Sequence, residues 1–477
     1  MLHIPLLRAG RPYRSLRQNI LNHISTGEPV ATVSQANQGV ISRDRLAGQR
    51  NQQALSRLSV AELTAICSRA GRLFCEESLP LYPDGGQMQT ADQYVTSLSA
   101  TTGLPHTFCR ANMEKIHRVL TEMDAVLDGL TRGMDTAIID AGWGIQGGRT
   151  LSYRRQTDAL GAVLPSNSPG VHSLWLAAIP LKVPLVLKPG GEEPWTPYRI
   201  AAALMAAGCP PEAFSLYPTD YGGATQILLH CERSMLFGGG DTVAPWRQDP
   251  RVEVHGPGRS KILLGADEAA RWESHVDLIC DSVAMNGGRS CINASSVWTP
   301  AHGRALAEAL AERLAQIEPT CLDDPAARLA AFSNPQAASR ISATIDRLLA
   351  TSGAEDLTAA LYGERLVSVD GCAFLRPTVI WCEDPQHPLA NTEYLFPFVS
   401  VVELGKQDQI PAAIGPSLVT TAISNDEDFQ AALMESAHID RLNLGPIPTY
   451  HVSWDQPHEG NLFEHLYRQR SFAALRA

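Results

Sequence analysis

The residue with the clearest chemical potential in this sequence is Cys291, which lies in the segment NGGRSCINASSVW, residues 286–298. It follows a glycine pair and an arginine and precedes a segment rich in strand-forming residues. In such a tight turn, nearby amide N–H groups can favour the thiolate, and the same amides can hold an oxyanion. A free cysteine is also commonly an inert core residue, and this chain has ten. The residues alone leave both interpretations open.

Length, composition and charge restrict the kinds of protein in which Cys291 could act. The chain has 477 residues, a natural length for two large domains with minor appendages. Its 39 basic and 50 acidic side chains give a formal charge of −11 without a dense basic run, so nucleic acid is not expected as a partner. The cysteines form no C-x-x-C pair, which favours reduced thiols in the cytoplasm over a disulfide framework or a metal site.

No segment has the pattern of an export signal or a membrane span. The N-terminal sequence meets an arginine at position 8 after a short apolar run, so it lacks the apolar core of a signal peptide. The most apolar stretch, residues 173–187, is interrupted by Pro180, Lys182 and Pro184. We expect it to form a buried strand flanked by a helix.

The elements that must position Cys291 follow from the hydrophobic pattern. Residues 54–78 and 107–132 carry apolar positions at helical spacing, so the N-terminal portion is predicted to be mostly helical. Strand-like runs separated by glycine-rich segments predict a long hairpin between about 136 and 156, leading into a strand at 161–164.

Further along, short apolar runs alternate with helical stretches. The predicted strands are 184–188, 214–217 and 234–237, and the predicted helices are 195–207 and 222–231. A second alternating region runs from about 261 to 440, with predicted helices at 268–285, 303–316 and 336–352. This alternation predicts an α/β fold with parallel sheets of the nucleotide-binding kind.

The segment around Cys291 resembles the nucleophile segment of the aldehyde dehydrogenase superfamily, in which N-x-G-Q-x-C is followed by small residues. Asn286, Gly288 and Cys291 match in place, whereas Arg289 replaces the usual glutamine. The resemblance implies that Cys291 is a covalent nucleophile that carries the substrate as a thioester.

Two further segments, in the family's order, strengthen the resemblance. LPSNSPG, residues 164–170, is similar to the P-W-N-x-P turn, which makes Asn167 the residue whose amide donates to the oxyanion. VPLVLKPGGEEPWTP, residues 183–197, is similar to V-V-L-K-P-S-E, so Lys188 and Pro189 are expected to meet the adenosine ribose. The family's glutamate stands one place late, as Glu192, which leaves NAD versus NADP open.

Two more segments concern the rest of the cofactor. MLFGGGDTVAPW, residues 235–246, is similar to the F-T-G-S turn that holds the diphosphate; the resemblance assigns the diphosphate to Phe237, Gly238, Gly239 and Gly240. NTEYLFPFV, residues 391–399, is similar to the E-x-x-F-G-P segment. Glu393 and Phe396 would then hold the nicotinamide ribose, with Pro397 in the glycine's place.

The resemblance implies two Rossmann-like, parallel-sheet domains with an oligomerisation hairpin, assembled as a homo-dimer or tetramer. The expected parts are a helical N-terminal part of the cofactor domain (1–135), the hairpin (136–156), the rest of the cofactor domain (157–254), the catalytic domain (255–440), and a C-terminal return and tail (441–477). The aromatic residues of the tail are expected to close the substrate tunnel, to pack on a neighbouring subunit, or to pack in the core.

One departure from the family bears on the reaction. Hydrolytic members carry E-L-G-G-K, whose glutamate activates water, but here the segment VEVHGPGRSKILLG, residues 252–265, places His255 near that position and Glu253 out of register. The text H-G-P-G-R-S is similar to the G-x-G-P-G-N of CoA-acylating members, which include the long-chain acyl-CoA reductases. Without a base aimed at water, the thioester survives until a thiol takes the acyl group.

Three functions follow. The favoured one is an NAD- or NADP-dependent, CoA-acylating oxidoreductase acting on an aldehyde or acyl thioester, with coenzyme A as co-substrate. The second is hydrolytic release of a carboxylic acid, with His255 or Glu253 as base. The third is a catalytically silent scaffold of this fold, against which the retention of Cys291, Asn167, Lys188 and Glu393 argues.

Overall fold

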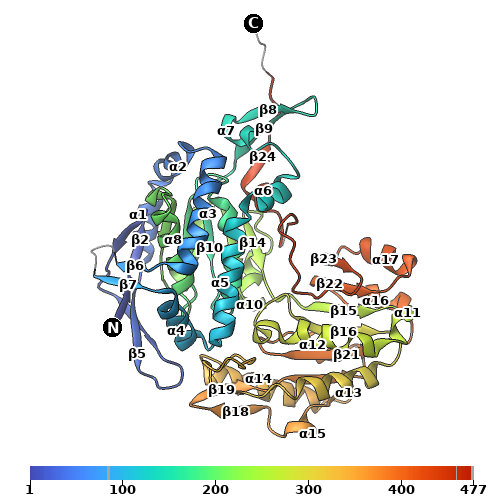
Figure 1. The fold of residues 1–477 in the computed structure, drawn as a ribbon. Coiled ribbons are helices and arrows are strands. Elements are labelled where there is room, and N and C mark those ends of the chain that lie inside the picture. Colours follow the sequence, from blue (N-terminus) through green and yellow to red (C-terminus); the bar gives the residue numbers. More distant parts are fainter. Residues whose placement is uncertain (83–85, 458, 474–477) are drawn as a thin grey trace.

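The computed structural model describes residues 1–82, 86–457 and 459–473, which form two α/β domains, each built on a seven-stranded sheet (Figure 1). In Figure 1 the first domain (blue to green) lies at the upper left and the second (yellow to red) at the lower right. No helix in the described ranges is long and apolar enough to cross a membrane.

The sheet of the first domain has the order β14-β13-β10-β11-β12-β2-β3. Its strands are β14 (Val252–His255), β13 (Arg233–Phe237), β10 (Leu160–Val163), β11 (Leu185–Lys188), β12 (Phe214–Leu216), β2 (Leu6–Arg8) and β3 (Arg11–Tyr13). The first five are parallel, whereas β2 and β3 are antiparallel. Helices α8 (Trp195–Ala206) and α9 (Tyr221–His230) connect the parallel strands, as the alternating pattern predicted.

The N-terminal region is helical where the periodicity predicted it, in α2, α3, α5 and α6 (Gly48–Ser56, Val60–Glu76, His106–Thr121 and Met123–Thr131). The prediction of a helical N-terminal part is wrong for the first 34 residues, which form five short strands. Besides β2 and β3, these are β1 (Leu2–Ile4), β4 (Gln18–Asn22) and β5 (Pro29–Ser34). Most have only three residues, too few for a readable alternation, and β2 is defined by its pairing with β12.

The sheet of the second domain has the order β17-β20-β21-β16-β15-β22-β23. Its strands are β17 (Ala354–Asp356), β20 (Thr378–Cys382), β21 (Phe398–Glu403), β16 (Ala294–Thr299), β15 (Ser260–Leu264), β22 (Ser417–Ile423) and β23 (Ile439–Leu444), all parallel except β17. Its longer helices are α12 (Val276–Ala284), α13 (Gly303–Leu314) and α14 (Pro335–Leu349).

The predicted helix at 268–285 is interrupted. It consists of α11 (Ala266–Ala269), a 3₁₀ turn at Trp272–His275, and α12. The carboxylate of Glu268 pairs with both Arg271 and, at 3.0 Å, His275. These ion pairs favour a tight local turn over a continuous helix.

The hairpin lies where it was predicted, but it is shorter. Its strands are β8 (Trp143–Gln146) and β9 (Arg149–Arg155), preceded by the short helix α7 (Ala137–Ala141). After β23 the chain crosses back from the second domain to the first, where α18 (Leu462–Leu466) is followed by β24 (Tyr467–Gln469), which pairs with β9 (Figure 1). Phe463 and Tyr467 are buried in the core of the first domain, so these tail aromatics pack within their own chain.

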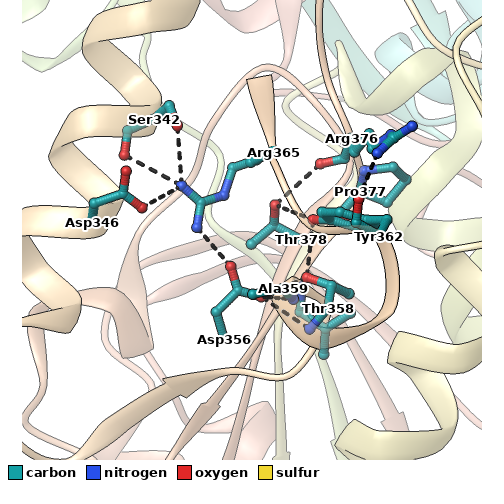
Figure 2. Close-up of polar contacts among 11 residues, drawn as sticks. Ser342, Asp346, Asp356, Thr358, Ala359, Tyr362, Arg365, Arg376, Pro377 and Thr378 are labelled. Atoms are coloured by element: carbon teal, nitrogen blue, oxygen red, sulfur yellow. Dashed lines mark hydrogen bonds and ion pairs between the residues drawn. The ribbon is translucent and has the colours of Figure 1, made fainter. Parts of the chain in front are cut away.

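One polar cluster fixes the outer part of the second domain (Figure 2). The Arg365 guanidinium, just before β18 (Leu366–Val369), donates to Asp346 of α14 at 2.8 Å and to Asp356 of β17 at 2.6 Å. The Thr358 hydroxyl also donates to Asp356, and the Tyr362 hydroxyl at the end of α15 (Ala359–Tyr362) donates to the Pro377 carbonyl at 2.7 Å. The cluster therefore joins a helix, a strand and two loops.

Candidate active site

A cavity of about 560 Å³ lies between the two domains at the carboxyl ends of β10, β13 and β14. In a parallel α/β sheet this edge is where ligands bind. Its lining comes from segments 165–174, 237–239, 255–257, 289–292, 332–341 and 393–395, together with Lys115 and Glu459. A larger hollow of about 720 Å³ lies beside the hairpin, but it contains none of the predicted site residues.

The turn before Cys291 is built from backbone that side chains rarely tolerate. Asn286, Gly287 and Gly288 have positive φ values of 53°, 65° and 69°. A Cβ at Gly288 would collide with the backbone of Phe396, so only glycine fits there. The Asn286 side chain accepts from Asn112 at 2.9 Å, which ties the turn to the first domain. The predicted nucleophile therefore lies on a fixed loop at the domain boundary.

Cys291 is half-buried and lines the cavity, whereas seven of the other nine cysteines are fully buried. Its Sγ lies 3.4 Å from Oε1 of Glu459. Burial raises the pKa of the Cys291 thiol well above its ordinary value, and the negative charges of Glu459 and Glu393 raise it further, against a lowering by Lys115. The sequence suggested a thiolate favoured by backbone amides; the structure instead holds a protonated thiol beside a carboxylate, because burial disfavours the thiolate and carboxylates from distant segments add to the effect.

His255 forms a pair with Glu459. Its Nδ1 lies 3.0 Å from Oε2 of Glu459, and its ring stacks on Phe237 with centroids 4.3 Å apart. Burial disfavours the imidazolium, but the hydrogen bond to Glu459 and the charges of Glu459 and Glu253 outweigh it, so the pKa of His255 is raised. The site therefore contains an imidazole–carboxylate pair next to the thiol.

Glu253, the other predicted base, lies behind His255. Its Oε1 is 3.9 Å from Nε2 of His255, and it lines a separate small cavity instead of the one containing Cys291. Burial raises the pKa of Glu253. Of the two predicted bases, only His255 lies in the wall of the main cavity.

The Asn167 side chain lies against the nucleophile loop, and its role as an oxyanion donor stays a prediction. Its Nδ2 donates to the carbonyl of Arg289 at 2.6 Å, two residues before Cys291. The Arg289 guanidinium is buried, donates to the Ala331 carbonyl and lies over the Phe332 ring at 5.2 Å. Burial lowers the pKa of Arg289 to about 10. Arg289, which replaces the family's glutamine, therefore anchors the loop from beneath.

The glycine turn after His255 also has a packing role. A Cβ at Gly258 would collide with the Cys291 carbonyl, which accepts from the Ser260 hydroxyl at 2.8 Å. Glycine at 258 is thus required by the close approach of the nucleophile loop. The H-G-P-G text consequently has a structural explanation that does not depend on the acyl acceptor.

The residues predicted to bind the adenosine half of the cofactor lie at the sheet edge. Lys188 ends β11; burial lowers its pKa, while the charge of Glu192 opposes this. The Glu192 carboxylate accepts from the Ser166 hydroxyl at 2.7 Å, so this late glutamate lies beside the predicted ribose lysine. Pro189 follows Lys188 directly, as in the family's K-P pair.

The glycine triplet leaves room for a ligand. Phe237, Gly238 and Gly239 line the cavity, and Gly240 begins the short helix α10 (Gly240–Val243). A Cβ at Gly239 or Gly240 would meet no atom of the described residues within 4 Å. This open backbone fits the diphosphate of a dinucleotide cofactor.

Glu393 lines the cavity and accepts from the backbone N–H of Arg259 at 2.5 Å. Burial raises the pKa of Glu393 to about 7. Phe396 is 2% exposed, packs near Tyr394 and Phe398 and does not line the cavity, so its contact with the nicotinamide ribose stays a prediction. Together with the open glycine backbone, Glu393 gives the cavity the features that a nicotinamide dinucleotide requires.

Sequence reasoning missed two cavity residues. Lys115 is a half-buried residue of α5, where a helical pattern gives no sign that one polar position faces a cavity. Glu459 lies in the tail, 168 residues from Cys291, which it contacts. In that segment only the aromatic residues had a predicted role. The only available signal was an acidic residue directly before a glycine.

Comparison with known proteins agrees with this geometry. The family model described as "Aldehyde dehydrogenase family" matches residues 14–414. A curated relative, methylmalonate-semialdehyde/malonate-semialdehyde dehydrogenase [acylating], mitochondrial, of Rattus norvegicus, is 22% identical over 270 residues. This match covers 54% of the chain and 49% of the relative, so the chain matches about half the length of that protein.

Solved structures share the fold over nearly the whole chain. Succinate-semialdehyde dehydrogenase from Burkholderia pseudomallei has a TM-score of 0.76 at 16% identity, covering 98% of this chain and 97% of that one. Indole-3-acetaldehyde dehydrogenase complexed with NAD⁺ has a TM-score of 0.76 at 15% identity, covering 99% and 96%. At such low identity these structures show the fold alone.

Proposed function

The chain belongs to the aldehyde dehydrogenase family and is an NAD(P)-dependent oxidoreductase of that type; on this premise we propose that Cys291 carries the acyl group as a thioester and passes it to coenzyme A. The same steps in reverse would reduce an acyl-CoA to the aldehyde.

In the proposed reaction the Cys291 sulfur attacks the aldehyde carbonyl carbon. The oxyanion is held by the Asn167 amide, which must leave the Arg289 carbonyl to do so, and by the backbone N–H of Cys291. The bound nicotinamide supplies the hydride acceptor. Lys188, the glycines at 238–240 and Glu393 would hold the cofactor, and the walls of the cavity limit access of bulk water.

One observation carries the choice of coenzyme A. In the sequence His255 stands near the position of the family's water-activating glutamate, and the carboxylate beside it, Glu459, has one oxygen on Cys291 and the other on His255. Both oxygens of Glu459 are thus in contact with side chains of the site. This arrangement favours transfer to a thiol, which needs a weaker base than water does. The curated relative named as acylating is consistent with this choice.

A second candidate, hydrolytic release of the acid, is favoured by a different aspect of the same contact. Once the thioester forms, Cys291 no longer has a thiol hydrogen, and Oε1 of Glu459 loses that partner. Once Glu459 has passed on the proton that it took from Cys291, its carboxylate lies beside the thioester and can accept a proton from water. The release step therefore needs a direct test.

The test follows the reduced cofactor and the products with a panel of aldehydes and NAD⁺ or NADP⁺, with and without coenzyme A. We expect one equivalent of reduced cofactor per subunit without coenzyme A, and sustained turnover to acyl-CoA with it. Sustained turnover to free acid without coenzyme A would contradict the acylating proposal and establish hydrolysis. Inclusion of the Cys321→Ala variant as a control separates the effect of the nucleophile from that of an exposed thiol.

We also propose that the hairpin joins subunits of a homo-dimer or tetramer. Ile145, on the first strand of the hairpin, is a large apolar side chain that is 65% exposed, so it is available for contact with a second subunit. Sedimentation of the wild-type protein and of the Ile145→Lys variant measures the oligomeric state. A monomeric wild type would contradict the proposed assembly.

A further inference from the structure

We propose that Glu459, supplied by the C-terminal tail, is the group that accepts the proton of Cys291, and that His255 is a positioning residue that orients and charge-stabilises Glu459. The inference rests on the proposed role of Cys291 as nucleophile. It replaces the bases expected from the sequence, His255 and Glu253, with a carboxylate from another segment.

The geometry of the three groups supports this order of proton transfer. The Cys291 Sγ lies 3.4 Å from Oε1 of Glu459, within hydrogen-bond distance for a thiol donor. His255 Nδ1 is 3.0 Å from the other oxygen, Oε2. Both partner side chains are almost inaccessible, at 7% exposure for Glu459 and 6% for His255. Because His255 reaches the thiol only through Glu459, it is suited to position the carboxylate.

The tail segment that follows Glu459 is held against the first domain. Gly460 has a φ of 77°, a left-handed conformation that favours glycine, and a Cβ there would also meet the carboxylate of Glu253. Asn461 caps α18 and donates to the Leu130 carbonyl at 3.0 Å. Phe463 is buried in the first domain. The carboxylate is therefore delivered by an anchored segment.

The charge balance explains why such an acceptor is needed. Burial and nearby carboxylates raise the pKa of the Cys291 thiol, so the sulfur is protonated at neutral pH. In the proposed step the S–H bond breaks and an O–H bond forms on Glu459 while the sulfur electron pair forms the C–S bond to the aldehyde carbon. The hydrogen bond to Glu459 and the charges of Glu459 and Glu253 raise the pKa of His255, which favours the imidazolium beside Glu459.

Several other titratable groups face this trio from the surrounding elements. They are Lys115 of α5, Glu253 of β14, Glu393 of the loop before β21, Asp440 and Arg441 of β23, and His465 of α18. Lys115 acts on both Cys291 and Glu459, and its positive charge favours the thiolate as it forms. Any measured pH profile therefore reports the coupled group.

The test compares Glu459→Gln with wild type in the full-length protein. We expect kcat/KM for aldehyde to fall by about 10² to 10⁴, as for loss of a positioned proton acceptor. At the same time, alkylation of Cys291 by iodoacetamide should shift to lower pH, because the substitution removes a negative charge beside the thiol. A thiol that ionises more readily but turns over more slowly is a signature that a merely structural residue would not give.

Two further variants keep the proposal falsifiable. Glu464→Gln removes an exposed carboxylate of the same tail, paired with Arg132 at 2.9 Å, and should leave kcat/KM unchanged. His255→Gln should lower kcat/KM less than Glu459→Gln does and should flatten the acid limb of the pH profile; if Glu459→Gln does not fold, Glu459→Asp must retain part of the activity.

Kinetics of Glu459→Gln within about twofold of wild type would overturn the proposal, as would equal losses of aldehyde turnover and cofactor affinity. Failure of the proposed function is distinct: it requires that Cys291→Ala remains active. An inactive Cys291→Ala together with a fully active Glu459→Gln would remove this inference alone.

Discussion

Two buried polar clusters in this molecule use charge in opposite ways. At Arg365 one cation meets two carboxylates directly, and although burial disfavours the charge, the hydrogen bonds to Asp356 and Asp346 raise the pKa of the guanidinium further (Figure 2). At Cys291 the thiol meets a carboxylate and carries a raised pKa. The first cluster holds its guanidinium in the charged form, whereas the second holds its thiol in the neutral form.

The difference teaches where to look for chemistry in this fold. None of the Arg365 cluster lies in the wall of the cavity, and its bonds join elements of one domain. The Cys291 cluster joins the nucleophile loop, β14 and the tail, with a local excess of carboxylates. Matched charges stabilise structure, while an excess of buried carboxylates shifts the pKa values of the neighbouring thiol and imidazole.

The largest effect is expected from Cys291→Ala. Loss of a covalent nucleophile typically lowers kcat by about 10⁴ or more, because the thioester cannot form. Cofactor binding, followed by fluorescence of the reduced nicotinamide, should persist because Lys188 and Glu393 are untouched. Retained turnover in this variant would remove the covalent mechanism.

Arg365→Met should act on stability alone. Removing one partner of a buried ion pair costs about 3–5 kcal/mol, because the buried Asp356 carboxylate loses its cationic partner. Denaturant titration measures the loss, and the pH profile of kcat at a permissive temperature should stay that of wild type. A shifted profile would show that the two clusters are coupled and would break the comparison.

Asn167→Ala should lower kcat by about 10² to 10³, the usual cost of one oxyanion donor, or about 2.7–4 kcal/mol. The aldehyde KM should change little because the amide acts mainly on the developing charge. Steady-state kinetics measures both, and an effect confined to KM would assign Asn167 to substrate binding instead.

The smallest predicted effect concerns Glu393. Its pKa of about 7, raised by burial, means that the carboxylate predominates above pH 7 and the neutral acid below it. As the pH falls through 7, the KM for the cofactor should rise, by up to about tenfold, because a charged acceptor is lost to the ribose hydroxyls. Glu393→Gln should raise KM at all pH values and abolish this dependence; an unchanged dependence would assign it to another group.

Much of the fold could be predicted because its central strands are buried on both faces. The run PLVLK, residues 184–188, does not alternate between apolar and polar residues, as expected for a strand buried on both faces. Its length fits a strand and its ends are clear, and it forms β11. The first 34 residues could not be predicted in this way, because strands of three residues depend on their partners.

Only those site residues that lie in contiguous sequence motifs could be predicted. Asn167, Glu393 and the glycine turn at 238–239 were found from short segments, and the structure brings them to one cavity. Glu459 could not be found, because its place beside Cys291 depends on the path of the tail across the domains. The protonated thiol was missed for the same reason, because its pKa is raised by burial in the folded chain and by carboxylates far away in sequence.

The most direct test of the account is to trap the thioester. Protein is mixed rapidly with aldehyde and oxidised cofactor in the absence of coenzyme A, quenched in acid and analysed by peptide mass. We predict an acyl adduct on Cys291 at close to one per subunit, matched by one equivalent of reduced cofactor and discharged when coenzyme A is added. Formation of reduced cofactor over many turnovers without any adduct on Cys291 would contradict the account.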